Sequence, residues 1–242
     1  MRLSIGGIFG TTFRIFLQNW VWITLEYAGA VIVATSAFTV FFPDLALRML
    51  CGEEIDDTLF LFVNPHSLIA SPVYTFVTVS VLLRLWPRVG GTPPPVLSAT
   101  SWVAIIVLSL LVDHLLNLSL FFMIIPLFIV SALTTLLMPL LVIEQRGWQS
   151  LSLSLRETMP HLLPLSGIWA AVLIPWLMLI FTTGPQRNPD SGATLVDLWA
   201  REIAHDLVSA PVNAFCICLI VAVYLALRLP PQKPDDLEKI FR

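Results

Sequence analysis

Charged residues are missing from four long stretches of this chain: 65–83, 115–143, 158–186 and 207–227. A fifth stretch, 20–42, contains Glu26 as its only charged residue. The hydrocarbon core of a bilayer is about 30 Å thick and is crossed by about 20 helical residues, and a helix satisfies its own backbone hydrogen bonds there. Each stretch is therefore long enough to cross a membrane.

Composition supports the same conclusion. Hydrophobic residues make up 57% of the chain and charged residues 12%, whereas soluble domains carry about 25% charged residues. The net charge of -3 and the three cysteines exclude a nucleic-acid binder, a disordered chain and a disulfide-stapled module. The sequence predicts an all-α polytopic membrane protein whose first partner is the lipid bilayer.

One predicted crossing is hidden, because Asp113 is the only charged residue between positions 89 and 143. That length is too great for a single crossing, so the chain must turn back within 117–126, where Pro126 cannot continue a helix without a kink. A cleavable signal peptide is rejected, since stretch 20–42 exceeds the 7–15 apolar residues typical of its core. Six transmembrane helices are predicted, at about 20–42, 66–86, 98–118, 123–143, 163–183 and 208–228.

Basic residues set the predicted orientation. With the N-terminus inside, ten of the thirteen Lys and Arg residues fall on the cytoplasmic side, and Arg48, Arg187 and Arg201 fall outside. This asymmetry follows the positive-inside rule. We therefore expect a multi-pass protein of the bacterial inner membrane with both ends in the cytoplasm, consisting of a membrane domain at 20–228 and a cytoplasmic tail at 229–242.

Three further segments have apolar residues at helical spacing. Residues 1–19 are predicted to form an interfacial amphipathic helix, and the alternative is an N-terminal extension of the first span. Residues 148–162 alternate in part like a strand, but a lone strand beside lipid would leave hydrogen bonds open, so a helix is favoured. Residues 195–207 indicate a helix at the outer interface.

Two parts of the sequence resemble a known family. Ser4–Asn19 is similar to the interfacial start, and 124–154 to a helix hairpin, of the membrane domain found with glycerophosphoryl diester phosphodiesterases. The resemblance implies structural roles for Pro126 at a turn, Glu144 at an inner helix end, Gly147 after it, and Ser154 on a short amphipathic helix; Leu127 stands where the family has glycine. It implies a stand-alone helical membrane module, because the family's enzymes cut phosphodiesters with a separate barrel domain.

Polar side chains inside predicted spans are the best functional candidates, because a charge at the centre of a crossing helix costs about 2.5–3.5 kcal/mol on insertion scales. Asp113, His114 and Asn117 form one such group in the third span. They could relay protons or bind a cation, or they could make structural hydrogen bonds at the outer end of the helix. Glu26 in the first span could face Arg84 or reach interfacial water.

No catalytic motif, cofactor fingerprint or metal-ligand spacing is present, so we expect neither a cofactor nor an enzyme. Three functions remain. The first is a non-catalytic module that organises a lipid or a membrane-associated or cytoplasmic partner protein. The second is a small ion or solute transporter or channel that uses Asp113, His114 and Asn117, and the third is a lipid-modifying enzyme.

Overall fold

The computed structural model describes residues 4–46, 65–89, 91–92, 94, 96–121, 124–183, 196, 199–200, 203–204 and 207–228. Its main helices are α1 (Ile5–Phe41), α4 (Pro65–Arg88), α5 (Ala99–Phe121), α6 (Ile124–Thr134), α7 (Leu137–Val142), α8 (Gln149–Thr158), the short 3-10 helix η1 (Met159–His161), α9 (Leu162–Thr183) and α11 (Ala210–Arg228). No strand occurs among the described residues.

Six helical segments of the described chain are long and apolar enough to cross a membrane. They correspond to the six predicted spans, and the fifth runs continuously through α8, η1 and α9. This result confirms the prediction of an all-α polytopic membrane protein. The ends of α4, α5, α9 and α11 lie within three residues of the predicted ends, because charges and prolines mark these ends in the sequence.

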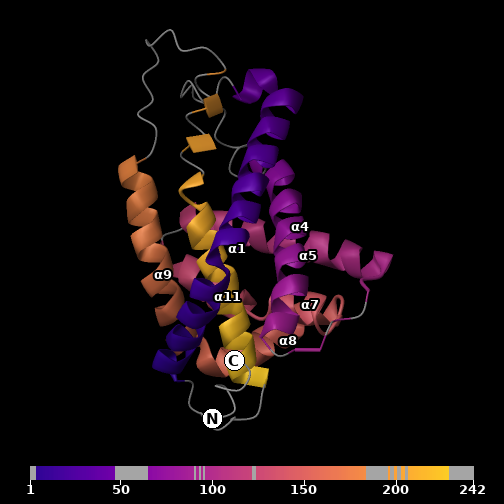
Figure 1. The fold of residues 1–242 in the computed structure, drawn as a ribbon, viewed down its shortest axis with the longest axis vertical. Coiled ribbons are helices and arrows are strands. Elements are labelled where there is room, and N and C mark those ends of the chain that lie inside the picture. Colours follow the sequence, from indigo (N-terminus) through magenta and orange to yellow (C-terminus); the bar gives the residue numbers. More distant parts are fainter. Residues whose placement is uncertain are drawn as a thin grey trace.

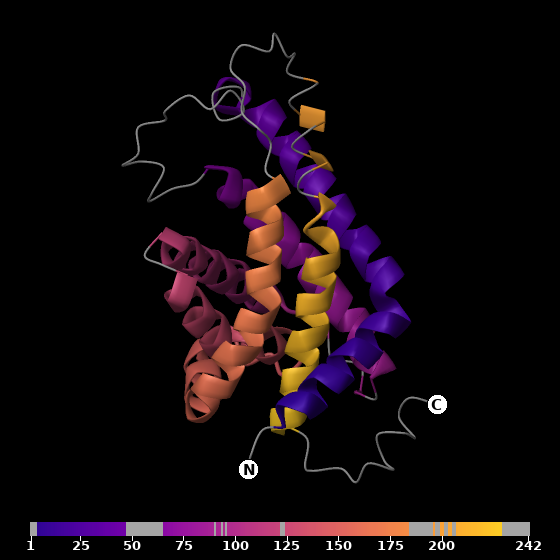
Figure 2. The same ribbon diagram turned by 90° about the vertical axis from the view of Figure 1, so that its left-hand side faces the viewer.

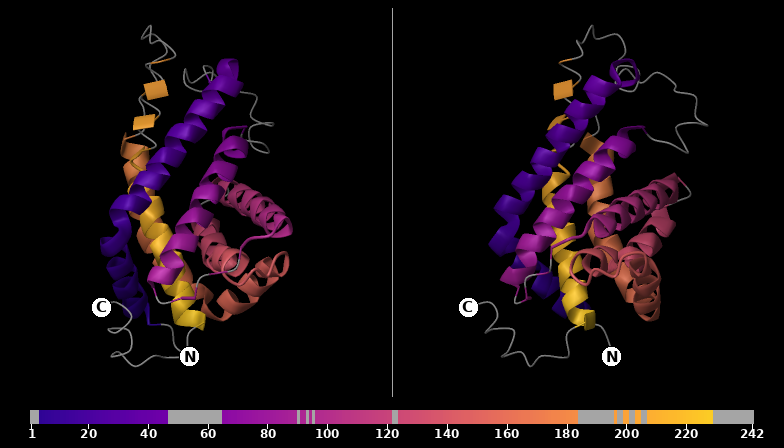
Figure 3. Two further views of the ribbon diagram at one scale, coloured as in Figure 1. Left: turned by 45° about the vertical axis from the view of Figure 1, so that its right-hand side comes forward. Right: turned by 90° about the vertical axis from the view of Figure 1, so that its right-hand side faces the viewer.

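Helices α1, α4, α9 and α11 run along the long axis of the molecule, and α5 lies across them (Figure 1). The two further views show the same oblique orientation of α5 (Figure 3). Helix α1 packs mainly against α11 and α4. Its buried side chains, including Ile8, Ile15 and Ile23, recur at helical spacing and enter one continuous hydrophobic core.

Helix α1 has no break at residue 19, where the sequence analysis placed a boundary. Figure 2 shows the helix changing direction in its N-terminal part. Two side chains in that part bond to the preceding turn: Thr12 Oγ1 donates to Ile8 O (2.8 Å) and Asn19 Nδ2 to Ile15 O (2.9 Å). Such bonds bend helices. The placement of residues 1–19 in the interface therefore stays a prediction.

The turn between α5 and α6 falls where it was predicted. Helix α5 ends at Phe121 and α6 begins at Ile124. Pro126 is the third residue of α6, where its missing N–H costs nothing because the first-turn N–H groups have no partner within the helix. Pro126 therefore lies in the first turn of α6, and its role at a turn, which the family resemblance implies, stays a prediction.

The fourth span is not the single helix predicted over 123–143. Helix α6 ends at Thr134 and α7 begins only at Leu137. Pro139 in α7 has no N–H to donate to Thr135 O, so the helical ladder cannot continue across this point. The interruption is still part of the core, since Leu136 and Leu140 are fully buried.

The segment after the fourth span is helical, as predicted, and forms α8 and η1. It lies at the end of the molecule where α4 and α11 finish (Figure 1), which we call the basal end. The predicted outer helix at 195–207 lies mostly outside the described residues.

Candidate functional site

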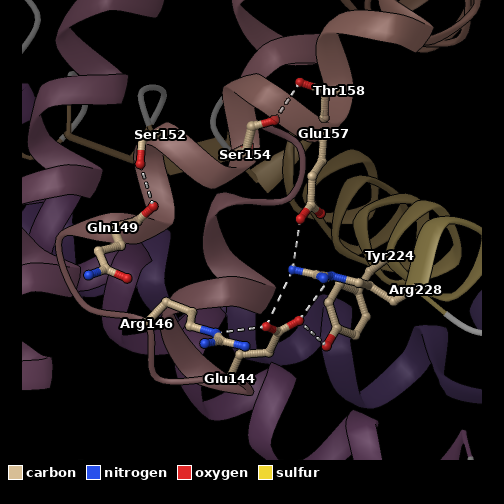
Figure 4. A network of polar contacts seen from close by, with 9 residues as sticks. All are labelled: Glu144, Arg146, Gln149, Ser152, Ser154, Glu157, Thr158, Tyr224 and Arg228. Atoms are coloured by element: carbon tan, nitrogen blue, oxygen red, sulfur yellow. Dashed lines mark hydrogen bonds and ion pairs between the residues drawn. The ribbon is translucent and has the colours of Figure 1, made fainter.

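The basal end contains a connected group of charged side chains (Figure 4). Glu144 follows α7 directly and is at its centre. Arg146 Nε donates to Glu144 Oε2 (3.1 Å), and Tyr224 OH in α11 donates to Glu144 Oε1 (3.0 Å). Arg228 Nε lies 3.1 Å from Glu144 Oε1 as an ion pair. One carboxylate thus joins the turn after α7 to the last helix.

Arg228 also reaches α8. Its Nη2 lies 3.1 Å from Glu157 Oε1, so its guanidinium bridges two carboxylates. The side chains of Glu144, Glu157 and Arg228 are 17%, 24% and 30% exposed. We call Glu144, Arg146, Glu157, Tyr224 and Arg228 the basal network. Its two arginines and two glutamates balance in formal charge, which suits partly buried groups.

Two residues in the turn between α7 and α8 adopt positive φ: Gln145 (53°) and Gly147 (55°). Only glycine takes this backbone conformation without a steric penalty. The Arg146 N–H donates to Leu140 O (3.0 Å) and so closes the turn. Gly147, which the family resemblance singled out, therefore has a physical reason to be glycine: it redirects the chain into α8 immediately after Glu144.

Two hydroxyl side chains of helix α8, those of Ser154 and Thr158, face the interruption between α6 and α7. Ser154 Oγ donates to Leu133 O (2.7 Å). Thr158 Oγ1 lies 3.1 Å from the same oxygen, but its single hydrogen has a closer acceptor in Ser154 O (2.7 Å). Close by, Trp169 Nε1 of α9 donates to Thr135 Oγ1 (2.7 Å). Ser154 and Thr158 are fully buried. The Leu133 carbonyl next to the α6–α7 interruption thus receives a hydroxyl donor, which offsets the cost of burying it.

A second polar group joins α1 to α4. Glu26 forms an ion pair with Arg84, which is one of the two placements considered from the sequence. Asn19 Oδ1 accepts from Arg88 Nη1 (3.0 Å) and from Trp22 Nε1 (3.0 Å). We call Asn19, Trp22, Glu26, Arg84 and Arg88 the α1–α4 clasp.

The predicted group in the third span is not brought together as one site. Asp113 accepts a hydrogen bond from Ser71 Oγ of α4. His114 is half-buried and Asn117 is exposed, and within the described ranges no hydrogen bond joins either to Asp113. Asp113 therefore links α5 to α4, as the structural alternative predicted. Tyr27 and Thr78 similarly pair between α1 and α4, with their oxygens 2.9 Å apart.

Sequence reasoning missed that Arg228 and Tyr224 meet Glu144, and that Arg228 also meets Glu157. It also missed that Asn19 and Trp22 hold Arg88. The hydrogen bonds among these contacts join residues that are between 69 and 84 positions apart in the sequence. A local spacing of residues in the sequence therefore cannot indicate them. One signal was available in the sequence: Glu144, Arg228 and Arg88 each lie within two residues of the end of a predicted span.

Among the described residues, no group of three or more His, Cys, Asp or Glu side chains could hold a metal ion. Cys216 and Cys218, both in α11, are free thiols.

Comparison of the chain with known families, with curated proteins and with solved structures finds no match.

Proposed function

We propose that this polytopic membrane protein is a non-catalytic module that organises a partner protein or lipid at its basal end. One observation carries the proposal: Arg228, the last described residue, is bound to both Glu144 and Glu157. The end of α11 is thereby tied to the turn after α7 and to α8. A connected end of this kind is suited to holding a docking face in a constant position.

The use of polar groups within the spans also supports the proposal. Asp113 bonds to Ser71, and Tyr27 to Thr78, each pair joining two neighbouring helices. A pathway for ions or a catalytic centre needs several polar groups that converge on one substrate position. Pairs that are satisfied between helices instead stabilise packing. This favours a module over the transporter and lipid-enzyme alternatives.

We further propose that the basal end faces the cytoplasm of a bacterial cell. Arg84, Arg88, Arg146 and Arg228 lie at helix ends or turns on this side, and positive charge near span ends favours the cytoplasmic side. The resemblance to the membrane domain associated with glycerophosphoryl diester phosphodiesterases agrees with this assignment, since Glu144, Gly147 and Ser154 all belong to the basal end.

The proposal is tested by purification in a mild detergent, followed by native mass spectrometry of the intact particle. We expect particles heavier than the 27.0 kDa chain by a reproducible partner or lipid. Glu144→Gln, which breaks the basal network, should reduce this added mass, and Asp113→Asn, which leaves the basal end intact, should not. Repeated recovery of the bare wild-type chain would overturn the proposal.

A further inference from the structure

Trp22 in the α1–α4 clasp lies against two guanidinium groups. The Cζ atoms of Arg84 and Arg88 are 5.1 and 4.9 Å from the centroid of its ring. Both distances are within the range of a favourable cation–π contact. Two positive groups are thus held close together between the middle of α1 and the basal end of α4, although like charges repel.

The two arginines differ in how their charge is compensated. Arg84 is paired with Glu26 and also donates to Ser80 Oγ (2.9 Å). Arg88 has an amide partner, Asn19, but no carboxylate within the part of the chain that the structure describes. In the neighbouring basal network, Arg146 and Arg228 share Glu144 and Glu157. Arg88 therefore contributes a positive charge that the clasp leaves uncompensated.

Arg88 is also oriented before any ligand arrives. Its side chain is held by Trp22 on one face and by Asn19 at Nη1. The residue is nevertheless exposed, and a guanidinium carries five N–H donors in a rigid fork. That fork matches two oxygens of a phosphate, and orientation in advance reduces the entropy lost on binding.

Exposed apolar side chains directly precede Trp22 of the clasp in α1. Trp20 and Val21 are 46% and 53% exposed beside it, and tryptophan is enriched where lipid headgroups meet the hydrocarbon. Basic sites between helices on the cytoplasmic side attract anionic lipid headgroups. A lipid phosphate can reach Arg88, because the side chain of Arg88 is exposed.

We propose that Arg88, held by Trp22 and Asn19 and assisted by Arg84, binds the phosphate of an anionic phospholipid. The inference rests on the proposed function and specifies its lipid: an anionic headgroup between the middle of α1 and the basal end of α4. The site requires no chemical change in the lipid. It adds a defined lipid contact to a module that otherwise meets the bilayer through apolar surface.

The test measures thermal unfolding of the full-length protein in a neutral detergent while phosphatidylglycerol is titrated in, with phosphatidylcholine as the uncharged reference. Phosphatidylglycerol should raise the unfolding midpoint saturably, and phosphatidylcholine should not. Arg88→Gln should raise the apparent dissociation constant for phosphatidylglycerol about tenfold, the effect of losing one charge-assisted contact. Arg156→Gln is the matched control, because Arg156 is an exposed arginine of α8. It should leave the constant unchanged.

Three results would overturn the inference: an unchanged constant in Arg88→Gln, an equal loss in Arg156→Gln, or displacement of the lipid by inorganic phosphate. If Arg88→Gln does not fold, Arg88→Lys takes its place. It keeps the charge but lacks the planar fork, and it should still weaken binding, so an unchanged constant there also contradicts the proposal. Should the site fail while wild-type particles still carry a protein partner, the proposed function stands without this lipid.

Discussion

Arg228 Nε lies 3.1 Å from Glu144 Oε1, although 84 residues of sequence separate the two side chains. The contact brings the last turn of α11 to the turn that follows α7. Tyr224, one helical turn before Arg228, donates to the same carboxylate and packs edge-on against Trp86 of α4, with ring centroids 5.4 Å apart. Three segments distant in sequence therefore share one anchoring point at the basal end.

Removing the charge of Glu144 should destabilise the protein. Glu144→Gln weakens the contacts to Arg146, Tyr224 and Arg228 together. We expect a loss of about 1–3 kcal/mol in the free energy of unfolding, the cost of leaving partly buried charged partners unsatisfied. Thermal and denaturant unfolding in detergent measure this loss. Glu157→Gln, with its single contact to Arg228, should cost less, and equal losses would contradict the central role of Glu144.

The turn after Glu144 should require glycine at position 147. Gly147→Ala places a side chain at φ 55° and should cost about 1 kcal/mol of stability, although no atom lies within 4 Å of the added Cβ. Gly29→Ala is the matched control, because its added Cβ also meets no atom within 4 Å but lies within helix α1. This control should be neutral or stabilising. Equal effects of the two substitutions in the same unfolding assay would contradict the assigned backbone strain.

Thr158 Oγ1, whose hydrogen is closer to Ser154 O, should turn to Leu133 O and replace Ser154 Oγ in part when that donor is removed. Ser154→Ala leaves Thr158 Oγ1 in place, so we expect a loss of about 1 kcal/mol. Adding Thr158→Val removes the second donor and should cost more than the sum of the single changes, because the carbonyl is then buried without either donor. Ser152→Ala, an exposed hydroxyl of the same helix, should change the unfolding midpoint little. Strict additivity would contradict the shared acceptor.

Asp113 should serve packing and not transport. In Asp113→Asn the remaining carbonyl oxygen can still accept the hydrogen bond from Ser71. We therefore expect the variant to unfold at a midpoint close to that of the wild type and to show the same ion flux in proteoliposomes. The transport alternative instead requires flux in the wild type that is lost in Asp113→Asn.

Much of the fold could be predicted from sequence, because each crossing of the lipid needs about 20 mostly apolar residues in a helix. The hairpin turn near Pro126 and the helix at 149–158 follow from proline chemistry and helical periodicity. The interruption at Thr135 was not predicted, although Pro139 signals it, since a proline inside an apolar run can kink a helix or end it. Neighbouring helices decide between these outcomes, and sequence does not show them.

The candidate site was predicted only in part. Glu26 with Arg84 and Glu144 with Arg146 are close enough in the expected topology to be paired from sequence. Arg228 could not be assigned to Glu144, because several basic residues lie at the same end and only helix rotation and packing select among them. Asp113, His114 and Asn117 looked like one group because they are near in sequence. In the structure, however, Asp113 bonds to Ser71 of α4, whereas Asn117, one turn further along the same face, is exposed.

The six-span arrangement with both ends in the cytoplasm is the claim on which the sidedness of the basal end depends. It is tested by labelling single cysteines in intact cells with a membrane-impermeant maleimide, in a background with Cys51, Cys216 and Cys218 replaced. The account predicts that Arg187→Cys is labelled from outside and that Lys239→Cys is labelled only after the membrane is permeabilised. Labelling of Lys239→Cys in intact cells would contradict it.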